Sequence, residues 1–260
     1  MADDARELGR QARMGFRFDL GRLHRPPLPS WRLTVVESAQ TTPRTRTVSF
    51  GGEGLAELDW RPGQDLLLSL PQEDGETARR HYTIRDFNRE ARRLDIDFVL
   101  HGQSPATYWA RHVQPGDAIE AHGPRGRTRL ANEAKDHLFV GDETAMPAIF
   151  AMVERLEAGA RADVLIEVEG PAETEALASD GEVSLEWVFR GASKPGPSGL
   201  LLDRLAALAP SPQGRHAYIL GETSNVRAQR HLLLDAGFER GQITAEGYWR
   251  PGRIGGHDHV

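Results

Sequence analysis

The chain has 260 residues, more than one typical domain of roughly 100–200, so the length predicts two packed domains with separate cores. Hydrophobic residues make up 39% and charged residues 27%, and no apolar run approaches the ~20 residues of a membrane span, so we expect a globular protein that does not cross a membrane. The net charge of −6 argues against a nucleic-acid partner, and the absence of cysteine excludes disulfides, thiolate-held zinc and iron–sulfur clusters.

The first 30 residues form a polar, arginine-rich lead that ends in a cluster of prolines. A short helix is expected over residues 3–13, and no function is assigned to the lead. Its first residues lack the basic and then apolar regions of a secretory signal, which predicts a cytoplasmic protein. Without cysteine, any redox chemistry must come from a bound organic cofactor or another metal.

Residues 31–133 are predicted to form an antiparallel Greek-key β-barrel. Their apolar segments are short, β-branched or alternating, and are bounded by glycine, proline and aspartate. The clearest strand is 94–100, where four apolar side chains fall on one face at a period of two. Turn signals at 61–63 and 114–117 separate the later strands.

After residue 133 strands and helices alternate, which predicts an α/β domain over 134–252 with a mostly parallel sheet. Strands are expected at 137–140, 164–168, 185–189 and 216–220. The first strand runs through Gly141 into a helix with Thr144 as its N-cap. Further helices are expected at 200–208 and 224–236. Residues 253–260 are expected to form a mobile tail.

The first candidate site is R-H-Y-T-I-R, residues 80–85, on an apparent strand. Arg80, Tyr82 and Ile84 share one face of this strand. A guanidinium suits a phosphate oxygen, an aromatic face suits a planar flavin ring, and Thr83 can hydrogen-bond at the edge of that ring. The alternative is a solvated, arginine-rich strand.

Two further candidate sites lie where a strand enters a helix. Ser104 as N-cap and Pro105 at the first helical position predict a helix start whose free amides suit a pyrophosphate. In V-G-D-E-T-A-M-P-A-I, residues 140–149, a strand runs through glycine into a helix, where a nucleotide would dock. This second motif is not G-x-G-x-x-G, and an ordinary capped helix is the alternative at both places.

Taken together, these motifs resemble the siderophore-interacting protein family. The resemblance rests on R-H-Y-T-I-R, L-D-I-D-F-V-L-H-G, S-P-A-T-Y-W-A, P-G-D, G-P-R-G, V-G-D-E-T-A-M-P-A-I, I-L-G-E and G-Y-W-R-P-G, in this order over residues 31–252. It implies a ferredoxin-reductase-like architecture, with an FAD-binding barrel followed by an NAD(P)H-binding α/β domain. It also implies electron transfer from NADPH or NADH, through FAD, to the iron of a ferric siderophore.

The resemblance implies a role for individual residues. Arg80 would hold an FAD phosphate, Tyr82 would pack on the isoalloxazine, and Thr83 would lie near its N5. The other implied FAD contacts are His81, Asp97, Val99, His101, Gly102, Ser104, Ala106, Thr107 and Trp109. The nicotinamide pocket would comprise Gly141, Asp142, Glu143, Thr144, Ala145, Gly221 and Glu222. Trp249, with Tyr248, would cover the flavin or line the substrate mouth. Met146 stands where the family pattern has leucine.

No protein acid or base and no resident metal is expected beyond the flavin. Many ferric siderophores are anionic, so a basic rim is predicted, although each arginine could equally be a solvated loop residue. The candidates are Arg125, Arg127, Arg129 and Arg250. Residues 169–173 hold no arginine to grip a 2′-phosphate, whereas Arg190 and Lys194 could do so, and NADH, NADPH and a ferredoxin all stay open as donors.

Three rival interpretations stay open. One is a flavin reductase whose acceptor is another protein. The second is a carrier of ferric siderophores that has no flavin and no catalytic activity. The third is a metal-binding protein that uses His257 and His259, although two histidines one residue apart form an incomplete site. A monomer is expected.

Overall fold

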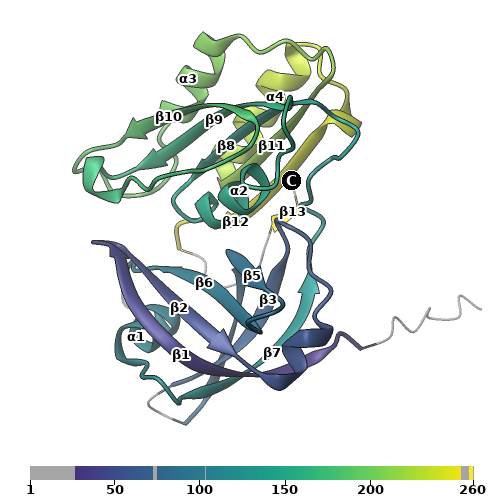
Figure 1. The fold of residues 1–260 in the computed structure, drawn as a ribbon. Helices are drawn as coiled ribbons and strands as arrows, with labels where there is room; N and C mark the ends of the chain where they lie inside the picture. Colours follow the sequence, from purple (N-terminus) through teal and green to yellow (C-terminus); the bar gives the residue numbers. More distant parts are fainter. Residues whose placement is uncertain (1–26, 73–74, 103, 253–257, 260) are drawn as a thin grey trace, which may run out of the picture.

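The computed structural model describes residues 27–72, 75–102, 104–252 and 258–259, which form two domains (Figure 1). The predicted helix over residues 3–13 and most of the predicted mobile tail, with His257, lie outside these described residues. No helix in the described part of the chain is long and apolar enough to cross a membrane.

The first domain is a seven-stranded antiparallel sheet with the order β4-β3-β7-β1-β2-β6-β5, which confirms the predicted barrel class. The last strand returns to lie between the first and third, as in a Greek key. Its strands are β1 (Ser30–Thr42), β2 (Thr45–Gly51), β3 (Asp65–Pro71), β4 (Thr77–Thr83), β5 (Asp86–Asn88), β6 (Arg93–Val99) and β7 (Ala118–Arg125). A 3-10 helix, η1 (Glu53–Glu57), follows β2, and α1 (Pro105–His112) follows β6.

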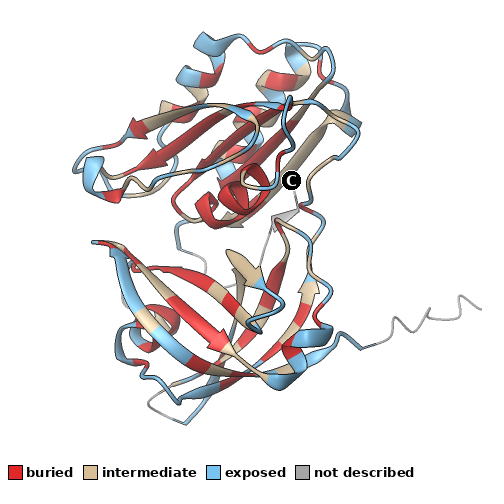
Figure 2. Ribbon diagram, viewed as in Figure 1, coloured by how far each residue is buried: buried red, intermediate tan, exposed pale blue. Residues whose placement is uncertain are grey.

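The barrel core follows the period of two in the sequence. Leu94, Ile96 and Phe98 of β6 are fully buried, as are alternate leucines of β3, because one face of each strand points inward (Figure 2). The helix α1 closes the core with Trp109, whose ring stacks on Phe50 at 6.2 Å between centroids. The helix is therefore attached to the barrel by its apolar face.

The second domain is a sheet of order β10-β9-β8-β11-β12-β13, parallel except for the last pair. Its strands are β8 (Asp136–Asp142), β9 (Arg161–Val168), β10 (Glu182–Phe189), β11 (Arg215–Glu222), β12 (Ile243–Trp249) and β13 (Asp258–His259). Its helices are α2 (Met146–Val153), α3 (Leu200–Leu208) and α4 (Thr223–Asp235), with 3-10 turns η2 (Pro171–Glu173) and η3 (Arg240–Gln242). The strands β12 and β13 were not among those predicted.

The helices cover both faces of this sheet. The helix α2 packs with Phe139 and Ile166 on one face, and α3 and α4 pack with Val140 and Ile219 on the other. Every residue of α2 is buried, because this helix lies on the side of the sheet that faces the barrel (Figures 1 and 2). The strand order places β8 between β9 and β11, so the strands that follow β8 in the sequence lie on both sides of it. The carboxyl end of β8 is therefore the point where the strand order changes direction, and ligands bind at this point in such folds.

Ion pairs join the two domains. The guanidinium of Arg85 donates to both carboxylate oxygens of Glu154, at 2.6 and 2.7 Å, and lies 5.4 Å from the Phe150 ring. On another side of the junction, Thr42 donates to Glu173 at 2.6 Å in a buried hydrogen bond. Bidentate and buried contacts of this kind have defined geometry, so they set the orientation of one domain on the other.

Besides Glu154, two further carboxylates lie near Arg85 at the domain junction. Asp97 lies 3.8 Å from its Nε, and Glu175 feels the charges of both Asp97 and Glu154. Burial, and then the charge of Asp97, raises the pKa of Glu175 to about 7. One Glu175 oxygen is buried without a hydrogen-bond partner, so the neutral carboxylic acid suits this position better than the carboxylate.

This raised pKa predicts that domain packing weakens as pH rises. Below the usual glutamate value of 4.5 the carboxyl is protonated in both folded and unfolded chains, and its contribution is lost as pH rises through about 7. Glu175→Gln should therefore raise the free energy of unfolding at about pH 8, by on the order of 1 kcal/mol once solvent screening is allowed for, and change little at about pH 5.

Urea unfolding at the two pH values measures this difference. The control is Glu157→Gln, because the Glu157 side chain is 82% exposed. An equal effect of Glu175→Gln at both pH values would contradict the assignment.

Candidate functional site

Arg80 and Tyr82 lie on the face of β4 that looks toward the barrel core. Their partners on β3 are Leu68 and Leu66, which are both fully buried. The Tyr82 ring is half-buried and packs on Phe98, with 4.3 Å between ring centroids. Burial raises the pKa of Tyr82 far above its usual value, so the phenol is neutral at physiological pH.

An aromatic stack supports Tyr82 from inside the barrel. Phe98 lies 5.3 Å from Trp109, which in turn stacks on Phe50. Ala106 is buried beside these rings in the same core. Trp109 and Ala106 therefore hold the platform in place, and their predicted contact with a cofactor stays a prediction.

His81 and Thr83 lie on the opposite face of β4. The Nδ1 of His81 is 2.8 Å from an oxygen of Asp65, a buried carboxylate on the neighbouring strand. Thr83 is hydrogen-bonded to Tyr248 of the α/β domain. The alternation of the strand thus separates His81 from Arg80 and Tyr82, and the predicted contact of His81 with a cofactor stays a prediction.

The helix α1 begins as predicted. Ser104 is the N-cap and accepts from the Thr107 amide at 3.1 Å, while Pro105 opens the helix. The Thr107 hydroxyl donates to the carbonyl of His101 at 3.0 Å, which ties the strand end to the helix start. The Ala106 amide has no partner within the helix, and the helix dipole adds positive charge at this end.

The turn before α1 leaves space in front of it. Gly102 has φ +59°, which favours glycine, and an added Cβ there would meet no atom within 4 Å. The helix also packs against β4, which carries Arg80. One N–H of the Arg80 guanidinium donates to the Arg79 carbonyl at 2.8 Å, and its other N–H groups, with the Ala106 amide at the helix start, are donors of the kind that a diphosphate accepts. The described residues therefore fit the phosphate end of FAD.

Two predicted FAD residues lie elsewhere on β6. Asp97 faces away from Phe98, accepts from the Thr47 hydroxyl at 2.6 Å and belongs to the ion cluster at the domain junction. Burial raises its pKa. Val99 is buried at the end of the strand. The structure thus gives Asp97 a place in the ion cluster and Val99 a packing role, and their predicted contact with a cofactor stays a prediction.

The predicted nicotinamide residues gather at the carboxyl ends of β8 and β11. Asp142 accepts from the Thr144 amide at 2.9 Å and from the Glu222 amide at 2.8 Å. Gly141 and Gly221 allow this close approach, because a Cβ at Gly221 would lie 2.6 Å from the Asp142 carboxylate. On the barrel side, burial and the positive charge of Arg44 lower the pKa of His101, whereas the negative charge of Asp142 acts to raise it.

The prediction of Thr144 as the N-cap of α2 was wrong. The N-cap is Ala145, which makes no side-chain cap bond, and the Thr144 hydroxyl donates to Asp142 instead, at 2.5 Å. An Asp two residues before a Thr offers the hydroxyl a charged acceptor, which is stronger than a backbone amide partner. The N-cap of α4 is Glu222, whose carboxylate accepts from the Ser224 and Asn225 amides at 2.8 and 2.9 Å.

Arg190 is not available for a 2′-phosphate. Its guanidinium side chain is 1% exposed and donates to both oxygens of Glu143, at 2.6 Å for one of them. Burial raises the pKa of Glu143 even though Arg190 opposes it. The pair holds the loop after β8 against the end of β10, while Lys194 on the following loop is exposed.

Tyr248 and Trp249 extend from the end of β12 into the domain junction. The Tyr248 hydroxyl is hydrogen-bonded to Thr83 on β4 and to Thr128 on the segment that joins the domains. Thr128 also donates to Glu246 at 2.8 Å. Burial raises the pKa of Tyr248 well above its usual value, so this hydroxyl stays protonated.

The predicted basic rim lies around this junction. Arg125, Arg127 and Arg129 are exposed and flank Thr128, while Arg250 is exposed and follows Trp249 directly. The hydrogen bond between Thr128 and Tyr248 brings the segment that carries these three arginines next to the segment that carries Arg250. Sequence reasoning missed Tyr248 as the link and Asp65 as a neighbour of Arg125 at 3.9 Å, and no local pattern indicated either.

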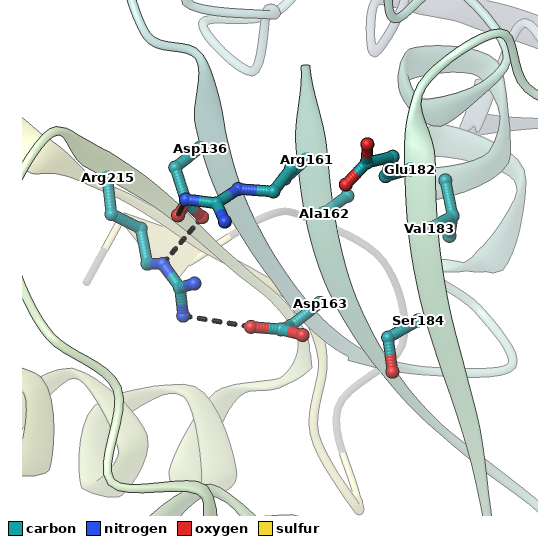
Figure 3. Close-up of a pocket in the computed structure, with 8 residues that line it drawn as sticks. All are labelled: Asp136, Arg161, Ala162, Asp163, Glu182, Val183, Ser184 and Arg215. Atoms are coloured by element: carbon teal, nitrogen blue, oxygen red, sulfur yellow. Dashed lines mark ion pairs between the residues drawn. The ribbon is translucent and has the colours of Figure 1, made fainter. Parts of the chain in front are cut away.

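A separate pocket of about 530 Å³ lies at the other edge of the parallel sheet (Figure 3). Arg215 reaches from β11 to Asp136 at 2.7 Å and to Asp163 at 3.0 Å, and Arg161 completes the cluster. These are the amino ends of the strands, whereas ligands of open α/β sheets bind at the carboxyl ends. The ion pairs therefore tie strand ends together. Among the described residues, no group of His, Cys, Asp and Glu side chains could hold a metal ion.

Comparisons with known proteins agree with this geometry. The model of the siderophore-interacting FAD-binding domain matches residues 68–128, and that of the siderophore-interacting protein matches residues 134–252. The ferric vibriobactin reductase ViuB of Vibrio cholerae is 30% identical over 77% of this chain and 73% of its own. The NADPH-dependent ferric-chelate reductase of Escherichia coli is 27% identical over 84% of this chain and 91% of its own.

Solved structures give the same result. A siderophore utilization protein from T. fusca superposes with a TM-score of 0.81 and 33% identity, over 88% of this chain and 95% of that one. A ferredoxin-NADP+ reductase from Plasmodium falciparum has a TM-score of 0.69 at 13% identity, over 84% of this chain and 96% of that one, which shows the fold alone. The ferredoxin-reductase-like fold class is thereby confirmed.

The donor set at β4 and α1 predicts that Arg80 is a main determinant of FAD affinity. Arg80→Ala should weaken FAD binding by roughly tenfold to a hundredfold, because a hydrogen bond to a charged group contributes about 1.5–3 kcal/mol. Quenching of flavin fluorescence on titration of the apoprotein measures the Kd. Arg79→Ala is the matched control, since Arg79 is exposed on the other face of the same strand. Equal Kd values for wild type and Arg80→Ala would contradict the assignment.

Proposed function

Because the chain belongs to the siderophore-interacting protein family, we propose that it is an FAD-dependent reductase that passes electrons from NADPH or NADH to the iron of a ferric siderophore. The barrel is the FAD-binding domain. When bound, FAD supplies the exchange between the two-electron chemistry of a nicotinamide and the one-electron reduction of iron. The protein has to bind and align three components.

The observation that carries this proposal is the Tyr248 junction. Its hydroxyl joins Thr83, on the strand assigned to the flavin, to Thr128, in the middle of the basic segment. An anionic chelate attracted by the arginines around Thr128 would therefore be held next to that strand. The carboxyl ends of β8 and β11, which we assign to the donor, lie beside this segment, because the Trp249 indole donates to Asp142 at 2.9 Å.

The residues around the junction favour binding and alignment over proton transfer. Arg80 and the first turn of α1 would hold the FAD diphosphate, while Tyr82 on its aromatic stack would support the ring. Tyr82 and Tyr248 both have raised pKa values, so neither hydroxyl ionises near neutral pH. Reduction of the metal is itself the release step, because Fe(II) is held far less tightly than Fe(III) by the hard oxygen ligands of a siderophore.

We place the reaction in the cytoplasm and infer a monomer that completes the site from its own two domains. Either reduced nicotinamide nucleotide would serve as donor, and a ferredoxin is the other donor we consider. Arg190 is bound to Glu143, so Lys194 is the remaining predicted residue for a 2′-phosphate.

A spectral titration tests the whole proposal. Purified protein loaded with FAD should be yellow, lose its visible absorption on anaerobic addition of NADPH or NADH, and recover it on addition of a ferric siderophore. Protein that stays colourless with FAD would support a siderophore carrier instead. Recovery with a protein acceptor but with no ferric chelate would support a flavin reductase of another kind.

The basic rim predicts a selective effect of Arg250. Arg250→Ala should raise the KM for an anionic ferric chelate by roughly threefold to tenfold, in keeping with the weakness of exposed charge pairs. Oxidation of NADPH or NADH by a neutral dye should be unchanged. Arg240→Ala is the control, because Arg240 is exposed at the opposite end of β12. An equal loss with chelate and dye would remove Arg250 from the substrate site.

A further inference from the structure

Asp142 is the most heavily hydrogen-bonded carboxylate at the carboxyl edge of the parallel sheet. It is 7% exposed, and its two oxygens have different partners. One oxygen accepts from the amide and the hydroxyl of Thr144, at 2.9 and 2.5 Å. The other accepts from the Glu222 amide at 2.8 Å and from the indole N–H of Trp249 at 2.9 Å. Four donors converge on one negative charge, and hydrogen bonds to a charged group are among the strongest in proteins.

The chain around this carboxylate is built to let the strand ends approach closely. Gly221 has φ +124°, and a side chain there would collide with the Asp142 carboxylate at 2.6 Å. A Cβ at Gly247 would likewise lie 2.6 Å from the Thr223 hydroxyl. That hydroxyl donates to the Trp249 carbonyl at 2.9 Å, so Trp249 is held at both its indole and its backbone.

The two oxygens connect to different parts of the site. Thr144 belongs to the loop 141–145, which we assign to the nicotinamide. Trp249 lies between Tyr248, which reaches Thr83 and Thr128, and Arg250, which we assign to the chelate. The first oxygen therefore holds the donor loop alone. The second holds Glu222, at the start of α4, together with the segment that carries the chelate side.

We propose that Asp142 is a positioning residue that aligns the donor loop through one carboxylate oxygen and the Trp249–Arg250 segment through the other. This inference rests on the proposed function, since it uses both the donor and the chelate. It goes beyond that function because it assigns the alignment of the two ligands to a single buried charge. A loop or an arginine that is already held in place binds its ligand with less loss of conformational freedom.

Three variants test the hydrogen bonds of the two Asp142 oxygens separately and together. Thr144→Val removes the hydroxyl bond to the first oxygen and should weaken donor binding alone. Trp249→Phe removes the indole bond to the second oxygen and should weaken chelate binding alone. Asp142→Asn removes the charge and places an amide N–H2 against two of the donors, so it should weaken both. We expect about a fivefold or larger rise in Kd in each affected case.

Equilibrium binding to the FAD-loaded protein is the measurement, because it does not depend on turnover. The donor-side probes are NADP+ and NAD+. The chelate-side probe is the gallium(III) complex of an anionic catecholate siderophore, which carries the same charge as the ferric complex and is not reduced. Trp187→Phe is the control for the loss of an indole. Trp187 lies in β10 and its ring packs on Phe150 of α2, and within the described part of the chain it makes no hydrogen bond to Asp142.

The outcomes are distinct. The inference is overturned if Asp142→Asn leaves both Kd values unchanged, or if Thr144→Val and Trp249→Phe each weaken both ligands equally, which would indicate a general loss of structure. A wild type that neither binds the gallium complex nor reduces the ferric one would overturn the proposed function, and with it the chelate half of the inference. If the wild type binds the gallium complex and reduces the ferric one, but Trp249→Phe leaves the Kd for the gallium complex unchanged, only the inference is overturned.

Discussion

The structure depends on how the α/β domain is fixed to the barrel, because the candidate site is built from both. Buried polar groups must be paired, and this requirement gives the junction its geometry. Arg85 and Glu154 form a bidentate pair on one side, and Thr42 and Glu173 form a buried hydrogen bond on another. Tyr248 completes the contact from the end of β12. Each of these bonds would be lost if one domain rotated, so the donor loop, the flavin strand and the basic rim keep a defined relation.

Within that frame, the barrel and the sheet use different physical means to hold their functional residues. The barrel uses aromatic packing, in which contacts between neighbouring rings lead from Tyr82 through Phe98 and Trp109 to Phe50 in the core. The sheet uses charge, with Asp142 and the Glu143–Arg190 pair binding its loops together. Packing suits a platform for a large planar ring, whereas charged hydrogen bonds suit loops that must stay ordered at the ends of strands.

Predictions from single motifs succeeded where the signal was local. The cap formed by Ser104 and Pro105 depends on neighbours three residues apart, and the structure has it as predicted. The face shared by Arg80 and Tyr82 follows from the period of a strand. Thr144 was misjudged as a cap because Asp142, two residues earlier, competes for its hydroxyl. Arg190 was considered for a phosphate because the sequence does not reveal that Glu143, 47 positions away, already occupies it.

The sequence by itself determined the two-domain class, the barrel and parallel-sheet patterns, the helix start at Ser104 and the family resemblance, since periodicity, caps and ordered motifs are written in consecutive residues. Only the tertiary structure decided that Tyr248 joins Thr83 to Thr128, that Trp249 is bonded to Asp142 and that Asp97 belongs to an ion cluster. The physical reason is that a buried polar atom takes its partner from whichever strand end or loop packs beside it. That neighbour is set by the assembly of two domains, and the local sequence carries no record of it.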